Sequence, residues 1–388
     1  MSDNVIPIFE EETPQKRISL KKQWIIFISI VAMIIVLLVW FLFTQTTALD
    51  GVKRFFRYFG VDENAYGDVH FEAYGNTSYA MVGSSFAVAS QSGLQLFSES
   101  GETLCSLSGS FTNPLLKSVG DRVLLYDVGG TRLVLLNADG DVLFDLIAGG
   151  KIFDADLCED SLCSVLYEGN DCYTVLDVFN ENGARLFTHR SESAFLNACA
   201  ISPDGSYVVV TTLGQEDISF LSTARILSTS SEEIQANVSF GTQLICDLAF
   251  LDDDTACAIG EDTLFFVDMD GSVKEEYIGE SAKIAGYCFT ESQLVILYDR
   301  YDLSLGYDLV CLNEEGEQTA SLNIGTQPTY FSQCENYICL LTPQEIRIYD
   351  HDLSLSSTKA HQAYLAALAR EDGTALCIGS GFAELYIP

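Results

Sequence analysis

Residues 122–146 read RVLLYDVGGTRLVLLNADGDVLFDL, and this stretch decides the fold. It contains three apolar runs of strand length, separated first by Gly129-Gly130 and then by the turn 137–140. Asn or Asp begins such a turn by bonding its own backbone, and Gly ends it by supplying a positive φ. Residues 122–146 therefore predict three consecutive antiparallel β-strands joined by tight turns.

The first of these runs recurs along the chain at a nearly constant interval. Its third residue occurs in eight copies, which are separated by 37 to 48 positions with a mean of about 41. Repeats of this length, each built from short strands, are typical of β-propellers. The equivalent residues are Ala87, Leu124, Cys163, Val209, Cys257, Val295, Cys339 and Cys377.

Each repeat continues with a strand that a turn closes, and then with a more polar strand such as residues 141–146 or 317–322. Polar strands are expected at the outer edge of a blade. Four strands per repeat in eight repeats predict an all-β, eight-bladed β-propeller, with seven blades as the alternative. The turn glycines that mark the repeats most clearly are Gly101, Gly140, Gly183, Gly271 and Gly316.

The two ends of the repeat region predict how the ring closes. Only one further strand, residues 383–387, follows Cys377, so the eighth blade lacks an outer strand. Residues 68–74 precede the first repeat and belong to no other blade. We expect this N-terminal strand to pair with the C-terminal strands, because closing the ring removes exposed sheet edges.

Residues 24–43 read WIIFISIVAMIIVLLVWFLF, with Ser29 as the one polar side chain and no charge. Twenty such residues in a helix cross a hydrocarbon core of ~30 Å. The sequence therefore predicts a tail at 1–23, a transmembrane helix at 24–43, a juxtamembrane linker at 44–67 and the propeller domain at 68–388. We expect the helix to contact the lipid bilayer as an uncleaved signal anchor, because its apolar run is long for a cleaved signal peptide.

The side of the membrane is predicted from the flanking charges and the length of the C-terminal domain. Four basic residues precede the helix and three follow it closely, which favours a cytoplasmic N-terminus, and long C-terminal domains translocate largely regardless of charge. The propeller is then extracytoplasmic at the cell membrane. The twelve cysteines favour the opposite arrangement, since unpaired thiols are commonest in reducing compartments.

The chain carries 55 acidic and 20 basic residues, a formal net charge of −35. This excludes a nucleic-acid-binding protein and favours basic partners or weakly bound divalent cations. The acidic runs 252–254 and 268–271 lack the Glu that completes a calcium loop, and they occupy turns where Asp is expected on backbone grounds. No metal ligand set, cofactor motif or catalytic signature is predicted.

Four cysteines occupy one position of the repeat, which holds Val, Leu or Ala in the other blades. A position that accepts these residues is a buried apolar slot, so we expect reduced, unreactive thiols there. Neighbouring blades place equivalent residues side by side, beyond the ~7 Å limit for a disulfide. Cys158 and Cys163 flank a turn and are the pair best placed for a bridge if one forms.

Three repeats have lengthened segments between their second and third strands, at 167–172, 213–220 and 299–308. Binding residues concentrate on loops carried by a rigid scaffold, and Arg and Tyr are enriched at interface hot spots. Arg300, Tyr301 and Tyr307 are therefore the candidate binding residues. The alternative is a tolerated surface insertion without a partner.

The turn ISPDGSYV at 201–208 resembles the turns of WD-repeat and YVTN-like bacterial propellers. The layout of short tail, one apolar segment and degenerate propeller also resembles an uncharacterised Firmicutes family, domain of unknown function 5711. The Gly-His and Trp-Asp dipeptides of true WD repeats are missing, so the blades are assigned from their period. This resemblance implies a propeller fold and a membrane location, and it implies no activity.

The predicted function is a membrane-anchored extracytoplasmic propeller that binds a protein partner as an assembly scaffold at the cell envelope. One alternative is an enzyme of envelope glycans with a site in the central funnel, which clustered carboxylates with raised pKa values would favour. The other is a membrane-tethered hub that faces the cytoplasm.

Overall fold

The computed structural model describes residues 69–216, 219–231, 234–278, 282–290, 293–300, 306–361 and 363–388, together with residues 29–31, 33, 34, 36, 54, 57 and 58. The chain divides into two compact units, Met1–Phe59 and Gly60–Pro388. The described residues of the first unit are helical. Within the part of the chain that is described, no helix combines the length and the apolar character needed to cross a bilayer. The rest of the predicted tail, transmembrane segment and linker lies outside the described residues.

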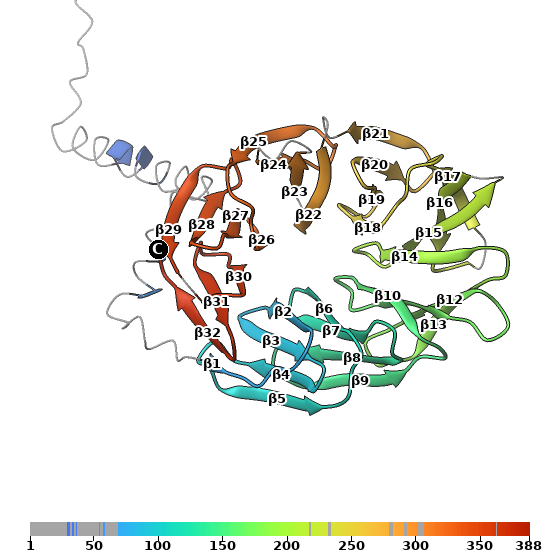
Figure 1. The fold of residues 1–388 in the computed structure, drawn as a ribbon, viewed down its shortest axis with the longest axis horizontal. Coiled ribbons are helices and arrows are strands. Elements are labelled where there is room, and N and C mark those ends of the chain that lie inside the picture. Colours follow the sequence, from blue (N-terminus) through green and yellow to red (C-terminus); the bar gives the residue numbers. More distant parts are fainter. Residues whose placement is uncertain are drawn as a thin grey trace, which may run out of the picture. The chain divides into compact units, whose positions relative to one another are not determined.

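In the second unit, the described residues form eight four-stranded antiparallel sheets arranged in a ring (Figure 1). This is the eight-bladed β-propeller that the repeat predicted. Blade 1 contains β2 (Thr77–Val82), β3 (Ser85–Ser90), β4 (Gly93–Phe97) and β5 (Thr103–Ser108), and blade 2 contains β6 (Pro114–Val119), β7 (Arg122–Asp127), β8 (Arg132–Asn137) and β9 (Val142–Ile147). Blade 3 contains β10 (Ile152–Leu157), β11 (Cys163–Glu168), β12 (Thr174–Phe179) and β13 (Arg185–Ser191), and blade 4 contains β14 (Phe195–Ile201), β15 (Tyr207–Glu216), β16 (Ser219–Ser228) and β17 (Ile234–Ser239).

The remaining blades follow in chain order, and in each blade the first strand is innermost (Figure 1). Blade 5 contains β18 (Asp247–Phe250), β19 (Thr255–Ile259), β20 (Thr263–Asp268) and β21 (Val273–Ile278), and blade 6 contains β22 (Ala282–Thr290), β23 (Gln293–Arg300), β24 (Tyr307–Leu312) and β25 (Gln318–Ile324). Blade 7 contains β26 (Tyr330–Cys334), β27 (Tyr337–Leu341), β28 (Glu345–Asp350) and β29 (Leu355–Ala360), and blade 8 contains β30 (Ala366–Ala369), β31 (Ala375–Gly379) and β32 (Phe382–Tyr386) together with β1 (Val69–His70).

The turn between the third and fourth strands has the predicted geometry. In blade 2, Asn137 Oδ1 accepts hydrogen bonds from the backbone N–H groups of Asp139 at 3.2 Å and Asp141 at 2.8 Å. Gly140 follows with a φ of 91°, which side chains rarely tolerate. The register of β8 and β9 shifts between Leu135 and Leu136, just before this turn. The Asn side chain and the glycine thus together set the position of the outer strand.

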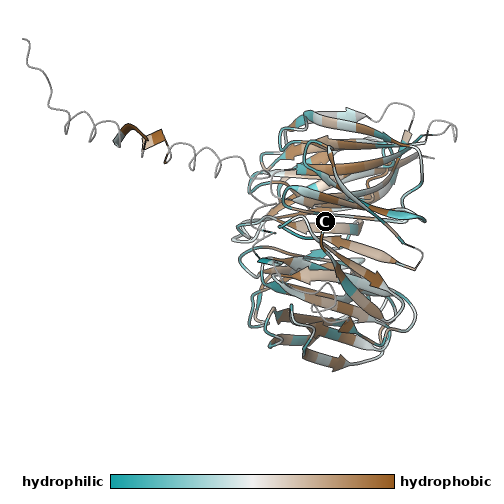
Figure 2. Cartoon of the chain, turned by 90° about the vertical axis from the view of Figure 1, so that its left-hand side faces the viewer, coloured by the Kyte–Doolittle hydropathy of each residue, from teal (hydrophilic) through white to brown (hydrophobic). Residues whose placement is uncertain are grey.

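The core lies between successive blades, where apolar side chains of adjacent sheets pack face to face. Seen from the side, the strands carry most of the hydrophobic residues of the propeller (Figure 2). The four cysteines of the repeat position are fully buried, as predicted, and all twelve cysteines are free thiols. Burial raises the pKa of Cys377 to about 12 and that of Cys163 further, so these thiols stay protonated at neutral pH.

The ring closes as the sequence predicted, although with a shorter strand. In β1, Val69 pairs with Ala383 and His70 with Phe382, and the Phe71 N–H donates to Gly381 O at 3.1 Å. Residues 71–74 continue without strand pairing. The eighth blade therefore obtains its outer strand from the N-terminal side of the domain.

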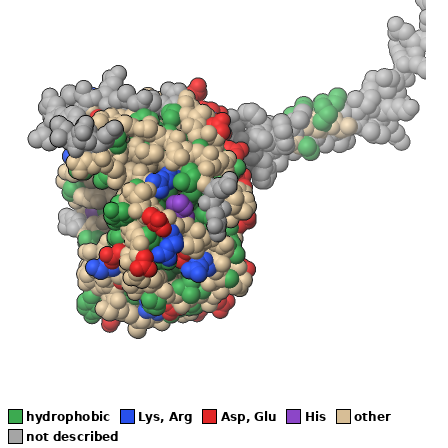
Figure 3. Space-filling model, turned by 90° about the vertical axis from the view of Figure 1, so that its right-hand side faces the viewer, with side chains coloured by type: hydrophobic (Ala, Val, Ile, Leu, Met, Phe, Trp, Pro, Cys, Tyr) green, Lys and Arg blue, Asp and Glu red, His purple; other side chains and the backbone are tan. Residues whose placement is uncertain are grey.

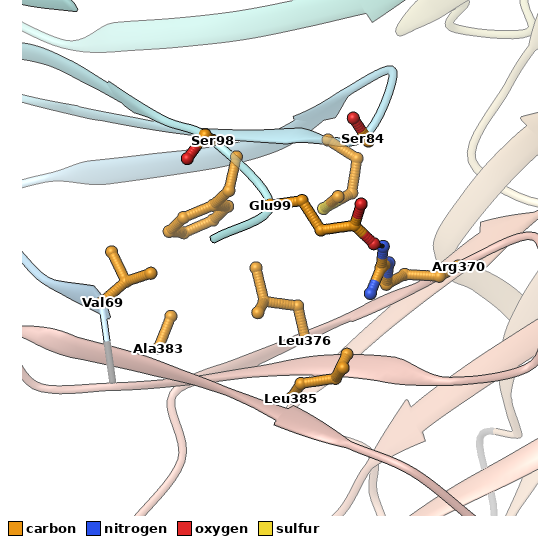
Figure 4. Close-up of a pocket in the computed structure, with 10 residues that line it drawn as sticks. Val69, Ser84, Ser98, Glu99, Arg370, Leu376, Ala383 and Leu385 are labelled. Atoms are coloured by element: carbon orange, nitrogen blue, oxygen red, sulfur yellow. Dashed lines mark hydrogen bonds and ion pairs between the residues drawn. The ribbon is translucent and has the colours of Figure 1, made fainter. Parts of the chain in front are cut away.

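Side chains from both ends of the domain fill the junction between blades 8 and 1 (Figure 4). Arg370 forms an ion pair with Glu99 at 2.9 Å, between residues 271 positions apart in the chain. Beside the pair lies a cavity of about 30 Å³, which Val69, Leu376 and other apolar side chains enclose. A cavity of this size holds about one water molecule.

The inner strands are connected by side chains that bond the backbone of the next blade. Asp154 Oδ2 accepts the N–H of Cys199 at 2.9 Å, and Asp156 Oδ2 accepts the N–H of Ile201 at 3.0 Å. These bonds satisfy backbone donors at the edge of an inner strand, which would otherwise remain unpaired. Equivalent bonds join Ser78 to Leu116 and Ser332 to Ala369.

One predicted loop is in fact part of the sheet. Residues 213–220 were expected to be a lengthened surface loop, but β15 and β16 remain paired from Leu213↔Ser222 to Glu216↔Ser219. The extra residues of blade 4 therefore lengthen a hairpin, because ladder hydrogen bonds satisfy their backbone groups. Phe220 near its end is 62% exposed.

Candidate functional site

The candidate site is an open pocket of about 640 Å³ lined mainly by residues of blades 5 and 6, which we name the blade 5–6 pocket. It opens on the face of the ring where second strands connect to third strands and where each blade continues into the next. Ligand pockets typically measure about 300–1,000 Å³. Its lining residues are Leu244, Cys246, Ile259, Gly260, Glu261, Lys283, Ile284, Ala285, Tyr287, Asp299, Tyr307 and Gln327.

A sharp turn between β19 and β20 forms one wall of the pocket. A Cβ atom on Gly260 would lie 2.8 Å from the carbonyl oxygen of Thr263, so the turn requires glycine there. The Gly260 N–H donates to this oxygen at 2.8 Å. The next residue, Glu261, accepts the N–H of Ile284 through its backbone oxygen at 2.7 Å. This bond fixes the turn of blade 5 against the inner strand of blade 6.

Three strands of blade 6 form the opposite wall. Lys283 of β22 pairs with Asp299 of β23, which in turn pairs with Tyr307 of β24. Residues directly opposite each other on antiparallel strands project to the same face of the sheet. A cation, a carboxylate and a phenol therefore lie side by side on the face of blade 6 that packs against blade 7, where Tyr307 contacts the apolar cluster of these two blades.

Tyr307 and Tyr287 both line the pocket, but they lie on opposite faces of the blade 6 sheet, Tyr307 toward blade 7 and Tyr287 toward blade 5. Burial and the charge of Asp299 raise the pKa of Tyr307. The Tyr287 hydroxyl donates to Asp247 Oδ2, which is not itself part of the lining. Burial and Asp247 raise the pKa of Tyr287, so it remains a neutral hydrogen-bond donor.

Asp247 connects the pocket with a charged cluster on the inner strands. Lys117 Nζ forms an ion pair with Asp156 Oδ1 at 3.0 Å. Burial opposes the charged form of Lys117, but the carboxylates of Asp156, Asp154 and Asp247 together raise its pKa. Burial raises the pKa of Asp154 to about 6, and Asp247 acts in the same direction, while Lys117 opposes the shift. The cluster holds three carboxylates and one ammonium group, from blades 2, 3 and 5.

The structure separates the three predicted binding residues. Tyr307 lines the pocket, as described above. Arg300 ends β23 and forms an ion pair with Asp308, whose other oxygen accepts Asn323 Nδ2 at 2.8 Å. Since adjacent residues of a strand face opposite sides, Arg300 faces away from Asp299. Tyr301 lies outside the described residues.

Sequence reasoning did not identify Asp247, Tyr287 or Glu261. Asp247 and Glu261 belong to blade 5 and Tyr287 to blade 6, and no short motif connects them. The sequence does contain one signal of the site, because the carboxylate of Asp247 begins an otherwise apolar inner strand, DLAF. Polar residues on inner strands deserve the same scrutiny as those in loops.

The acidic turns are engaged in backbone bonding, as their position predicted. Asp252 Oδ1 accepts the N–H groups of Asp254 at 2.8 Å and Thr255 at 2.6 Å. Asp268 forms an ion pair with Lys274 at 2.9 Å. Among the described residues, no group of three or more His, Cys, Asp or Glu side chains is arranged to hold a metal ion.

A second charged surface lies on the side of the ring formed by blades 3 and 4. Figure 3 shows basic, acidic and histidine side chains gathered there. Arg225 Nη1 donates to Ser191 Oγ at 3.4 Å, and Arg185 lies 3.5 Å from the buried carboxylate of Asp177. Burial, followed by the charge of Arg225, lowers the pKa of His189. A pocket of about 380 Å³ between blades 3 and 4 includes Arg185 but neither Arg225 nor His189, and its lining residues are Arg185, Leu186, Phe187, Thr188, Thr229, Ser230 and Ser231.

Comparison with known families identifies the domain. Residues 65–360 match DUF5711, described as a family of unknown function. The chain belongs to DUF5711. The match extends over β1 to β29 and ends before β30, so the three C-terminal strands of the eighth blade lie beyond it. The sequence had suggested this family from its layout.

Solved structures place this DUF5711 chain among propellers. The C-terminal WD40 domain of Sif2 is similar with a TM-score of 0.61 and 13% identity, over 84% of this chain and 98% of that domain. Hydrazine synthase of Kuenenia stuttgartiensis is similar with a TM-score of 0.49 and 12% identity, over 69% of this chain and 93% of that one. At these identities the first likeness establishes the fold alone, and the second supports no argument. None of the curated proteins compared matches the chain.

Proposed function

We propose that this DUF5711 protein is a single-pass, membrane-anchored scaffold whose propeller binds a protein partner at the cell envelope. The observation that carries the proposal is the blade 5–6 pocket, where Tyr307 and Tyr287 are presented by a rigid ring. Aromatic residues in pockets on a rigid scaffold are typical of interface hot spots. The uncharged run at 24–43 supports the anchor, and the flanking charges support a cytoplasmic N-terminus.

Crosslinking and capture from native membranes test the binding role. Tyr307→Ala and Tyr301→Ala should each reduce the amount of captured partner while lowering the unfolding midpoint of the chain only slightly. Tyr173→Ala is a matched control, because Tyr173 is 58% exposed and lies in the equivalent connection of blade 3. Unchanged capture by the Tyr307 and Tyr301 variants would refute the role of these residues.

The side of the membrane has a direct test in Cys246. This cysteine is exposed, and it lines the blade 5–6 pocket. A membrane-impermeant maleimide should label it on intact cells if the propeller is extracytoplasmic, and Cys246→Ser should abolish that label. Labelling that requires permeabilised cells would instead establish the cytoplasmic hub.

The glycan-enzyme alternative is favoured by one observation, the raised pKa of Asp154 at the centre of the ring. A carboxyl group with a pKa of about 6 is suited to general acid catalysis. However, its oxygens accept the N–H groups of Ala155 and Cys199, which gives the residue a structural role. Release of sugar fragments from envelope glycans by the purified chain, and its loss in Asp154→Asn, would establish the enzyme.

A further inference from the structure

The exposed aromatic side chains of the propeller lie on one face of the ring. Among its described residues four aromatic side chains are exposed, and all four lie in or beside connections on the face that carries the blade 5–6 pocket. At the opposite ends of the blades the exposed large apolar side chains are aliphatic, and each is one of the first two residues of an outer strand. Aromatic residues are enriched in protein interfaces, so the pocket face is the one suited to a partner. The four exposed aromatic residues are Tyr74, Tyr173, Phe195 and Phe220.

The lengthened hairpin of blade 4 carries the most exposed of these rings. Beyond the pair Leu213↔Ser222, β15 and β16 continue for three more residue pairs, and Phe220 lies opposite Gln215. Leu213 and Phe220 project to the same face of the hairpin, because residues opposite each other share a face and successive residues alternate. This face is directed toward blade 5, since Ser222 shares it and its Oγ accepts the N–H of Ile245 at 3.3 Å.

Two further apolar side chains continue the surface formed by the hairpin. Leu244, in the connection from blade 4 to blade 5, is 47% exposed and precedes Ile245, whose N–H is bonded to the hairpin. Phe195 begins β14 opposite Leu213, and its ring lies 5.0 Å, centroid to centroid, from that of Phe153 in β10. These residues form one surface, which we name the blade 4–5 patch: Phe195, Leu213, Phe220 and Leu244.

The blade 4–5 patch is continuous with the blade 5–6 pocket. Leu244 belongs to the patch and also lines the pocket, and Cys246 follows it in the same lining. Contiguous exposed apolar side chains mark interaction sites, whereas single ones scattered over a surface need no explanation. A chain segment that covers the patch can therefore extend into the pocket.

Carboxylates flank the patch at two positions. Glu192 precedes Phe195 by three residues, and Glu261 lines the pocket together with Leu244. Both are exposed, and neither forms an ion pair with a described residue. The pocket lining contains one cation, Lys283. The net charge of −35 on the whole chain adds a long-range attraction for basic partners.

We propose that the blade 4–5 patch binds a segment of a partner protein that presents apolar side chains flanked by lysine or arginine. This inference rests on the proposed scaffold function and specifies the chemistry of its partner. The apolar side chains of the segment cover Phe220 and Leu244, and its basic side chains face the carboxylates of Glu192 and Glu261. Charge then governs the rate of encounter, and burial of the patch supplies the affinity.

Three short peptides in a Gly-Ser frame test this chemistry. The first alternates Leu with Lys, the second has Ser in place of Leu, and the third has Glu in place of Lys. Cys246 reports binding, because it is exposed and lies two residues from Leu244. With the purified full-length chain in nanodiscs of zwitterionic lipid, the Leu/Lys peptide should slow maleimide reaction at Cys246 by ~10-fold near saturation. The other two peptides should leave this rate unchanged, and mass spectrometry of the fragment that contains Cys246 measures it.

Two double variants, each removing two exposed apolar side chains, locate the effect. Phe220→Ser with Leu244→Ser should abolish protection by the Leu/Lys peptide. Leu186→Ser with Leu355→Ser should preserve it, because these residues are 55% and 56% exposed on the outer strands β13 and β29, outside the patch. Each rate is compared with that of the same variant without peptide, since Leu244 is a neighbour of Cys246.

Several results would overturn the proposed chemistry. Equal protection by the Ser/Lys peptide would show attraction by charge alone, and equal protection by the Leu/Glu peptide would show that charge plays no part. Protection retained in the Phe220/Leu244 variant would place the peptide elsewhere. Dimers that form without peptide and are lost in that variant would make the patch a contact between copies of this chain.

The outcomes also separate this inference from the proposed function. If the Leu/Lys peptide gives no protection but membrane capture still depends on Tyr307, the scaffold function remains and only the inference fails. If capture is also independent of Tyr307 and Tyr301, both fail.

Discussion

The junction between blades 8 and 1 and the junction between blades 5 and 6 use the same repeat in opposite ways. At the first, no chain segment runs from blade 8 into blade 1. Aromatic rings and one ion pair fill the space between these blades and leave a cavity of about 30 Å³. At the second, the chain runs directly from β21 to β22, and a pocket of about 640 Å³ remains open. The closure is thus more completely filled than the pocket region, although no chain connection holds blades 8 and 1 together.

The comparison extends to the inner strands on the two sides of the ring. Near the closure, Ser78 and Ser332 bond the backbone of the next blade with neutral hydroxyl groups. Toward the pocket, Asp154 and Asp156 make the same kind of bond with carboxylates. The two sides therefore have the same backbone connectivity but different charge, and they should respond differently to substitution and to pH.

The largest expected effect is at the closure. Phe71 is 6% exposed and packs at 6.2 Å, centroid to centroid, against Phe86. Phe71→Ala should lower the free energy of unfolding by about 3–4 kcal/mol, because it leaves a cavity where β1 is held by two residue pairs. Urea denaturation of the full-length chain measures the change. A loss below ~1 kcal/mol would show that the ring does not depend on this packing.

The next effect is a pH dependence on the pocket side. The pKa of Asp154 is about 6 in the folded chain and ~3.9 in the unfolded chain, so between these values the folded protein retains a proton that the unfolded chain has released. Its contribution to stability is therefore complete below pH ~4 and is lost as the pH rises through about 6, on the order of 3 kcal/mol in total.

Asp154→Asn removes the titrating carboxyl group and therefore isolates its pH-dependent contribution to the unfolding free energy. The difference in unfolding free energy between the unmodified chain and the variant should fall between pH 4 and pH 7, measured by urea denaturation at each pH. Asp204→Asn is the contrasting control. Burial opposes ionisation of Asp204, but hydrogen bonds from Ser206 and Ser202 lower its pKa, so its contribution is lost only as the pH falls. Parallel pH profiles for both variants would contradict the assignment.

A smaller effect is expected for the ion pair across the closure. Arg370 is 11% exposed and Glu99 is 30% exposed, so the pair is partly screened by solvent. Arg370→Ala should cost about 1–2 kcal/mol, mainly by removing the cation that pairs with Glu99 in the junction. A double-mutant cycle with Glu99→Ala should give a coupling energy of about 0.5–1 kcal/mol. Additive losses would indicate that the two side chains act independently.

The smallest effect on stability is expected at the pocket. Tyr307→Ala should lower the unfolding free energy by about 1 kcal/mol, because the side chain borders the open pocket and packs only in part against the apolar cluster of blades 6 and 7. The same variant should lose partner capture. A destabilisation close to that of Phe71→Ala would show that the open junction, like the closed one, is needed to hold the ring together.

The sequence predicted the ring and its closure because both follow from local patterns. The period of about 41 residues and the turns at Gly101 and Gly140 mark blade boundaries, and an unmatched strand near residue 69 indicates how the eighth blade is completed. The pocket could not be predicted in the same way. It depends on how Glu261, Tyr287 and Asp299 of separate strands meet in space, which no spacing in the chain encodes.

The lengthened segments between second and third strands show the same limit of prediction from the sequence. An insertion can form a loop or extend a hairpin, and residues 213–220 extend one because their alternating backbone groups continue the ladder of β15 and β16. Of Arg300 and Tyr307, only the second lines the pocket, since strand alternation directs Arg300 to the other face. Residue type made both side chains candidates for binding, and only the strand register shows which of them lines the pocket.

The pairing of β1 with β32 also constrains the order of folding. Residues 69 and 70 leave the ribosome long before residues 382 and 383, to which they bind. During synthesis, the earlier blades form an open arc with two uncovered ends, and no local event can seal it. The final step joins the first-made strand to the last-made one, so a nascent or truncated chain exposes apolar blade faces on which chaperones or other copies can bind.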